Sequence, residues 1–191
     1  MVFVATPSGL GHPAIGLDQA DTEGPGTMEE EPINPRAYPD RPFVGVGVVI
    51  FRGDEVLLAQ RGKRPRRKTW SIPGGAQEVG ETVHEAGQRE ILEETGIQIE
   101  ILGLVDVVDS ISHDEEGNVA FHYTLVDLFA EWRSGEAEAA DDVSDVCWVG
   151  LDALGTYNLR TATHDVILLA ERKRRKILSG ERKIRKPRSL F

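Results

Sequence analysis

The chain has 191 residues, 40% hydrophobic and 28% charged, a composition typical of one soluble globular domain. Its apolar runs are too short to cross a bilayer, and its N-terminal residues lack the basic and apolar segments of a secretory signal. A single cysteine, Cys147, excludes an internal disulfide framework, so we expect a cytoplasmic protein with no membrane partner.

The net charge of −10 is unevenly distributed along the chain. Residues 171–191 contain ten Lys or Arg and two Glu, so the preceding residues are strongly acidic. An acidic body is a poor general partner for nucleic acid. We expect the basic segment to be a solvated helix end and tail. Two alternatives remain: it contacts RNA or polyphosphate, or it folds back on the acidic body.

The first predicted elements form a hairpin. Residues 1–42 hold seven of the ten prolines, which indicates a flexible N-terminal extension. Runs rich in β-branched and aliphatic residues then predict strands over 43–51 and 55–61. The basic loop 62–69 follows.

A helix is predicted over residues 82–95. Thr82 is a suitable N-cap, Glu85 occupies the capping-box position, and Gly96 follows the last helical residue.

The remaining pattern predicts strands near 97–112, 119–132 and 143–149, and a final helix over 161–178. Strands between two substantial helices indicate an α/β domain over 43–170, with helices packed on the faces of a mixed sheet.

Three glutamates of the first helix share one face. At about 100° per residue, Glu90, Glu93 and Glu94 continue the face on which Ala86 and Gly87 lie. Like charges four residues apart cost about 0.2–0.5 kcal/mol per pair, and more when partly buried, unless cations share the site. Mg²⁺ takes oxygen ligands and binds few protein carboxylates.

The alternative is a solvated acidic face. The small residues on the same face argue against it, because they let another backbone approach closely. The sharp turn at residues 73–75 could also direct a carbonyl at the same metal. Arg89, four residues from both Glu85 and Glu93, can anchor the acidic edge, while Glu81 can hold the preceding loop.

Gly75, Glu81 and the run Arg89–Ile97 resemble the Nudix box, G-x5-E-x7-R-E-U-x-E-E-x-G-U, in which U is a bulky aliphatic residue. Every specified position is filled. The resemblance covers about residues 43–170.

The resemblance implies an α/β/α sandwich and a hydrolase that uses Mg²⁺ or Mn²⁺. Such enzymes cleave a nucleoside diphosphate linked to another moiety. Glu90 and Glu94 would be the principal metal ligands, and Glu93 a further ligand or a residue that orients water. The Gly75 carbonyl would join them. Arg89 and Glu81 would support these ligands.

The reaction implied is attack of water on phosphorus. Glu93 is our first candidate for the general base. Acidic residues in the loop after Trp132 are alternatives, with Asp141 and Asp142 placed ahead of Glu136 and Glu138.

Three residues near the box are candidates for binding substrate. Arg61 and Arg67 belong to a basic stretch suited to a polyphosphate chain, although a solubilising loop is the alternative for each. Trp70 could stack on a base or pack in the core.

The substrate is expected to be a nucleoside triphosphate or a related nucleotide derivative. An ADP-ribose or nucleotide-sugar pyrophosphatase is the first alternative, although Ser112 and His113 stand where the ADP-ribose type tends to carry a proline. The second is an RNA-associated nucleotide-binding module or RNA 5′-pyrophosphohydrolase. Whether the chain forms a homodimer stays open.

Overall fold

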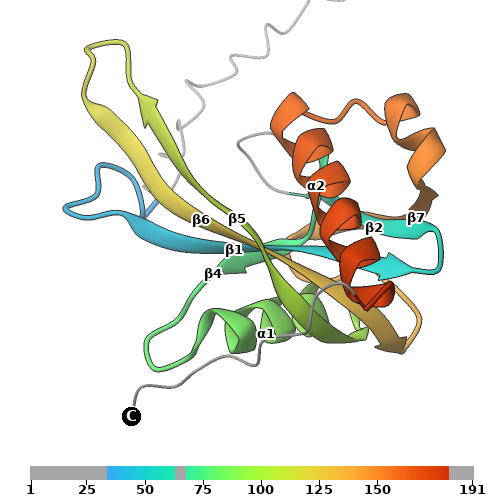
Figure 1. The fold of residues 1–191 in the computed structure, drawn as a ribbon. Helices are drawn as coiled ribbons and strands as arrows, with labels where there is room; N and C mark the ends of the chain where they lie inside the picture. The colour runs from blue at the N-terminus through green and yellow to red at the C-terminus, as the bar shows by residue number, and fades with distance from the viewer. Residues whose placement is uncertain (1–33, 63–67, 181–191) are drawn as a thin grey trace, which may run out of the picture. The chain divides into compact units, whose positions relative to one another are not determined.

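The computed structural model describes residues 34–62 and 68–180 (Figure 1). Most of the predicted N-terminal extension and the last residues of the basic tail therefore lie outside the described residues. No helix within these two ranges is long and apolar enough to span a membrane.

A mixed sheet forms the centre of the fold. Its main order is β3-β2-β1-β6-β5, and β4 pairs with β1 while β7 pairs with β2. The central strands β1 and β6 run parallel, and the other pairs are antiparallel. The strands are β1 (Phe43–Arg52), β2 (Glu55–Arg61), β3 (Trp70–Ser71), β4 (Gly74–Ala76), β5 (Gln98–His113), β6 (Val119–Ser134) and β7 (Val143–Gly150).

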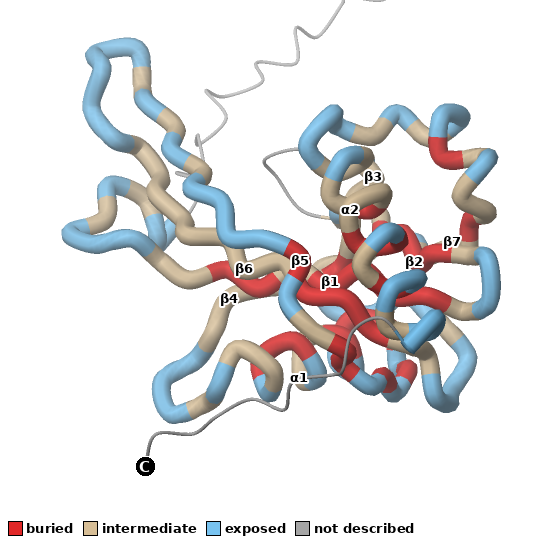
Figure 2. Tube along the Cα trace, in the orientation of Figure 1, coloured by how far each residue is buried: buried red, intermediate tan, exposed pale blue. Residues whose placement is uncertain are grey.

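Helices cover both faces of the sheet. Helix α1 (Val83–Thr95) lies on one face, and helix α2 (Thr161–Leu178) lies on the other with the short 3₁₀ helix η1 (Leu151–Thr156) (Figure 1). Alternate residues of β1 point to opposite faces, so Val48 packs on the α1 side and Phe51 on the α2 side. The two resulting cores confirm the predicted α/β/α sandwich (Figure 2).

The ends of α1 are those predicted from sequence. The Glu85 amide donates to Thr82 Oγ1 at 3.2 Å, and the Thr82 amide donates to the Glu85 carboxylate at 2.8 Å. Gly96 ends the helix with a φ of 70°, a left-handed conformation that glycine adopts without a Cβ penalty. Local sequence thus sets where the three glutamates lie along the helix axis.

The C-terminal half of α2 differs from the predicted solvated helix end. The helix continues past residue 170, and Glu171 and Arg174 are each only 8% exposed. Arg174 donates to Glu131 at 2.6 and 3.2 Å and to the Gly53 carbonyl at 2.9 Å, and it lies over the Phe51 ring. At these positions the chain folds back on the acidic body, because carboxylate, carbonyl and ring together replace water around the guanidinium.

The distal half of the β5–β6 hairpin extends beyond both helices (Figure 1). Most of its surface is exposed or half-buried (Figure 2). We call residues 104–122 the β5–β6 arm. Residues 34–42 contact its tip, where the Tyr38 amide donates to the Ala120 carbonyl at 2.9 Å and the Tyr38 hydroxyl donates to Asp114.

Candidate active site

The candidate site forms where the glycine turn at the start of β4 meets the face of α1. The Gly74 amide donates to the Glu94 carboxylate at 2.9 Å. Gly74 has a φ of 139°, which only glycine adopts readily. A Cβ added at Gly75 would lie 2.3 Å from the Glu90 carboxyl carbon. Both glycines are therefore needed for the turn to lie directly against the two glutamates.

These two carboxylates are partly removed from water. Glu94 is 8% exposed, and burial raises its pKa to about 7, with further increases from the charges of Glu90 and Asp142. The Gly74 amide and Arg61 act in the opposite direction. Burial also raises the pKa of Glu90. Two desolvated carboxylates this close together form a site that a cation would stabilise.

Arg89 fastens the acidic edge of α1 to the preceding loop. Its guanidinium donates twice to Glu81, at 2.7 and 3.1 Å, and once to the Ala76 carbonyl at 3.0 Å. It also donates to Glu90 at 3.0 Å and to Glu93 at 3.1 Å. The pKa of Arg89 is raised, first by its hydrogen bond to Glu81. Arg89 thus links Glu81 to Glu90 and Glu93, and the supporting role that the resemblance implies for Arg89 and Glu81 stays a prediction.

Glu93 lies at the outer edge of this cluster. Its side chain is 50% exposed, compared with 15% for Glu90, and its ion pair with Arg89 runs along the helix surface. Water therefore reaches Glu93 more readily than the other two glutamates.

The loop between β6 and β7 is attached to the C-terminal end of α1. The Ala140 amide donates to the Glu94 carbonyl at 2.9 Å. Asp142 is close enough to raise the pKa of Glu94, and its own carbonyl accepts from the Gly62 amide at 2.8 Å. Asp141 precedes it with a φ of 51°. The structure thus links Asp142 electrostatically to the buried glutamate, a choice that the sequence leaves open.

The three residues predicted to bind substrate are placed differently. Arg61, at the end of β2, lowers the pKa of Glu94 and so belongs to the electrostatic surroundings of the carboxylates. Arg67 lies outside the described residues. Trp70 packs with the core on the α2 side, where its ring meets Tyr157 edge-on at 5.4 Å. The structure therefore places Arg61, and not Trp70, with the acidic site.

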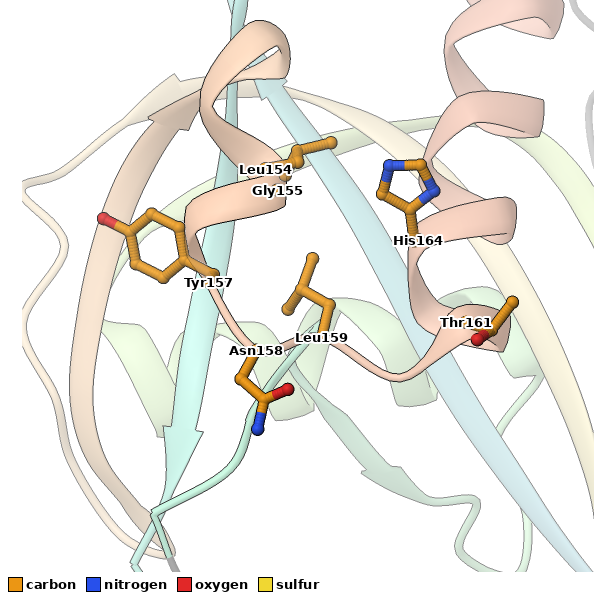
Figure 3. A pocket seen from close by; sticks show the side chains of 7 residues that line it. All are labelled: Leu154, Gly155, Tyr157, Asn158, Leu159, Thr161 and His164. Carbon is orange, nitrogen blue, oxygen red and sulfur yellow. The ribbon is translucent and has the colours of Figure 1, made fainter.

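A separate pocket opens on the α2 side beside Tyr157 (Figure 3). It has a volume of about 290 Å³, and η1, the following loop and the start of α2 supply its lining. The lining residues are Leu154, Gly155, Tyr157, Asn158, Leu159, Thr161 and His164. The sequence analysis did not find this pocket, because its residues show no motif and come together only when α2 folds onto the sheet.

The chemistry of the donors fits a hard divalent cation. Glu90 and Glu94 supply carboxylate oxygens beside a turn whose backbone carbonyls are further oxygen donors. Within residues 34–62 and 68–180, no group of three or more His, Cys, Asp or Glu side chains forms a preassembled metal site. The Gly74 amide, which holds Glu94 in place, is a positioning group that the residue pattern alone did not reveal.

The family assignment follows from these features and from a direct match. Residues 41–170 match the family model described as NUDIX domain, which is more than half of the chain. The chain belongs to the Nudix hydrolase family, and the resemblance predicted from the box is confirmed.

Relatives agree with this assignment. An ADP-ribose pyrophosphatase from Methanocaldococcus jannaschii is 34% identical over 113 residues, which cover 59% of this chain and 64% of that protein. The 8-oxo-dGDP phosphatase NUDT18 of Mus musculus is 38% identical over 86 residues, or 42% of this chain and 27% of that one. The chain therefore spans less than two thirds of both curated relatives.

A solved structure confirms the fold. The MutT NUDIX hydrolase from Burkholderia pseudomallei is 32% identical, with a TM-score of 0.59. The match covers 68% of this chain and 98% of that one.

Proposed function

We propose that this Nudix domain is a Mg²⁺- or Mn²⁺-dependent hydrolase that cleaves the diphosphate bond of a nucleoside diphosphate linked to another moiety. One observation carries the proposal: Glu90 and Glu94 are both partly desolvated, and both lie against the Gly74–Gly75 turn. A helix that only needed an apolar contact would place aliphatic residues there.

The residues proposed to hold the cation are Glu90 and Glu94, with Glu93 and the Gly75 carbonyl as further donors. The bound ion would neutralise phosphate oxygens and increase the acidity of a coordinated water. Arg89 keeps Glu90 and Glu93 in position through direct hydrogen bonds and ties them to Glu81.

The chain offers two places for the proton that the attacking water loses. Glu93 is the more exposed candidate, and its link to Arg89 fixes its direction. Asp142 is the second, because it faces the same acidic environment from the β6–β7 loop. Arg61 is the proposed phosphate contact, because it acts on the charge of Glu94 and precedes Gly62, whose amide donates to the Asp142 carbonyl.

The names of two curated relatives support a substrate that contains a nucleoside diphosphate, while the order of candidates follows from the residue pattern of the chain. One is an ADP-ribose pyrophosphatase and the other an 8-oxo-dGDP phosphatase, so both names contain a nucleoside diphosphate. We place a nucleoside triphosphate or related derivative first. The archaeal relative supports ADP-ribose as the second candidate, although Ser112 and His113 replace the proline typical of that type.

A pure RNA-binding module has less support. Two of the basic residues it would use are engaged within the chain. Arg174 pairs with Glu131, and Lys173 donates to the carbonyls of Leu104 and Val105.

A substrate panel tests the proposal. The full chain is incubated with nucleoside triphosphates, 8-oxo-dGDP, ADP-ribose and dinucleoside polyphosphates, with Mg²⁺, Mn²⁺ or EDTA, and the products are resolved by mass. We expect metal-dependent hydrolysis of at least one member. Glu94→Gln should lower kcat by more than the roughly 10–100-fold loss typical of supporting residues around a metal.

Glu100→Gln is the matched control, because Glu100 is half-exposed on β5 and pairs with Arg133 away from the turn. It should retain wild-type kcat. Hydrolysis that persists in EDTA, or a Glu94→Gln variant as active as the wild type, would contradict the proposal.

A further inference from the structure

The loop between β4 and α1, residues 77–82, carries Glu81 to the edge of the candidate site. Residues 78–80 of this loop are exposed, and the Val79 side chain is fully accessible to water (Figure 2). Apolar packing therefore does not fix the conformation of these residues. Hydrogen bonds have to hold Glu81 in the position from which its carboxylate accepts from Arg89.

Gln77 makes one hydrogen bond with each of its two amides. Its backbone amide donates to the Val44 carbonyl of β1 at 3.1 Å, which continues the pairing of β4 with β1 by one residue. Its side-chain amide donates to the Glu81 carbonyl at 2.7 Å. The Gln77 side chain thus spans the loop and joins the main chain of Glu81 to the sheet.

From Glu81 the connection continues to the acidic face of α1. Both carboxylate oxygens of Glu81 accept from Arg89, at 2.7 and 3.1 Å, and one of them also accepts from the Glu78 amide at 2.7 Å. The same guanidinium donates to Glu90 at 3.0 Å and to Glu93 at 3.1 Å. A shift of the Glu81 main chain would therefore move the group that holds these two glutamates.

We propose that Gln77 is a positioning residue that, through Glu81 and Arg89, keeps the carboxylates of the cation site in place. The inference rests on the proposed function for the presence of the cation. It goes beyond the family resemblance, because residue 77 falls on an unspecified position of the Nudix box. The side chain at this position has to reach across the loop and present a hydrogen-bond donor. Glutamine does both, whereas methionine has a similar length and no donor.

Calorimetric titration of the full chain with Mn²⁺ tests the inference without relying on hydrolysis. Gln77→Met should raise the Kd for Mn²⁺ by about tenfold, the lower end of the loss typical of groups that support metal ligands. Gln88→Met is the matched control and should keep the wild-type Kd. Gln88 also donates its side-chain amide to a carbonyl, that of Ile99, but it lies about 200° around the helix from Glu90. Each variant loses one hydrogen bond, so the Tm of either should fall by no more than about 4 °C.

A double-mutant cycle tests the route through Glu81. Glu81→Ala removes the carboxylate that receives the guanidinium, so adding Gln77→Met to this variant should leave its Kd for Mn²⁺ unchanged. A further tenfold loss in that background overturns the proposal, as does a Gln77→Met single variant with wild-type affinity or a wild type that binds no Mn²⁺. A wild type that binds Mn²⁺ and hydrolyses no member of the substrate panel contradicts the proposed function alone, and the Kd values then still decide the role of Gln77.

Discussion

Buried glutamates occur on both faces of the sheet, but their surroundings differ. On the α2 face, Glu131 and Glu171 flank Arg174, which donates twice to Glu131 and lies 3.6 Å from Glu171. On the α1 face, Glu94 accepts a backbone amide, and burial raises its pKa to about 7. The first cluster is neutralised by Arg174 together with Arg175, which donates to Glu171 at 2.5 Å, and it serves stability. In the second cluster, Glu94 is held by a backbone amide and has no arginine hydrogen-bonded to its carboxylate in the described structure, so a bound cation would stabilise its charged form.

The largest expected effect removes Arg174 from the neutralised cluster. Arg174→Met should lower the free energy of unfolding by about 3–5 kcal/mol, because half-buried Glu131 loses its cation and buried Glu171 keeps only the exposed Arg175. Urea unfolding measures the loss. Arg172→Met is the control, since Arg172 is an exposed arginine of the same helix and its loss should cost less than about 1 kcal/mol. Hydrolysis per folded molecule should stay unchanged, and a fall in kcat would mean that the two clusters are not independent.

The next largest effect is expected at the glycine turn on the α1 face. Gly75→Ala places a Cβ 2.3 Å from the Glu90 carboxyl carbon, so that side chain must move. Hydrolysis should fall by about 10–100-fold, the loss typical when a metal ligand is displaced indirectly. Steady-state kinetics measures it. Gly155→Ala, whose Cβ would meet nothing within 4 Å, should behave like the wild type. If Gly75→Ala were as active as Gly155→Ala, the position of Glu90 would not matter for hydrolysis.

Without metal, the charge on Glu94 should cost stability. Its pKa is raised from 4.5 to about 7, so the folded state binds the proton more tightly than the unfolded state does. Stability from this group is complete below about pH 4.5 and is lost as pH rises through 7. In EDTA, Glu94→Gln should therefore exceed the wild type in free energy of unfolding by about 3 kcal/mol at pH 8 and match it near pH 4. Paired urea titrations at the two pH values measure the difference, and a pH-independent gap would refute the assignment.

The smallest expected effect is stabilisation by the metal itself. Mg²⁺ at about ten times its Kd should add roughly 1.4 kcal/mol to the wild type at pH 8, because it binds only the folded chain. The gain should shrink at pH 6, where a proton competes for Glu94. Glu94→Gln should lose the gain. Thermal unfolding with and without Mg²⁺ gives these values, and a Tm that Mg²⁺ leaves unchanged at both pH values would argue against a cation site at Glu94.

Features encoded by neighbouring residues were predictable from sequence. The capping box at Thr82 and Glu85 and the terminal Gly96 act within a few residues of one another, so the bounds of α1 follow from local pattern. The approach of Glu90 and Glu94 to the glycine turn was also expected, since α-helical periodicity puts both on one face.

Features that depend on distant partners were not predictable. Arg174 was expected to be solvated, but its partners, Glu131 and Gly53, are separated from it by 43 and 121 positions. The sequence also could not show which of Asp141 and Asp142 acts on the charge of Glu94, because this depends on how the β6–β7 loop meets α1. Trp70 fitted either base stacking or core packing until the fold placed it against Tyr157.

The β6–β7 loop is bound to the last turn of α1 through the main chain. The Glu138 amide donates to the Thr95 carbonyl at 3.0 Å, and the Ala140 amide donates to the Glu94 carbonyl at 2.9 Å. These two carbonyls belong to the set that a helix terminus leaves without an intrahelical donor. If the loop moved away from α1, both carbonyls would lose their hydrogen-bond donors. Asp142 thus belongs to a loop whose position next to Glu94 is fixed by main-chain hydrogen bonds to α1.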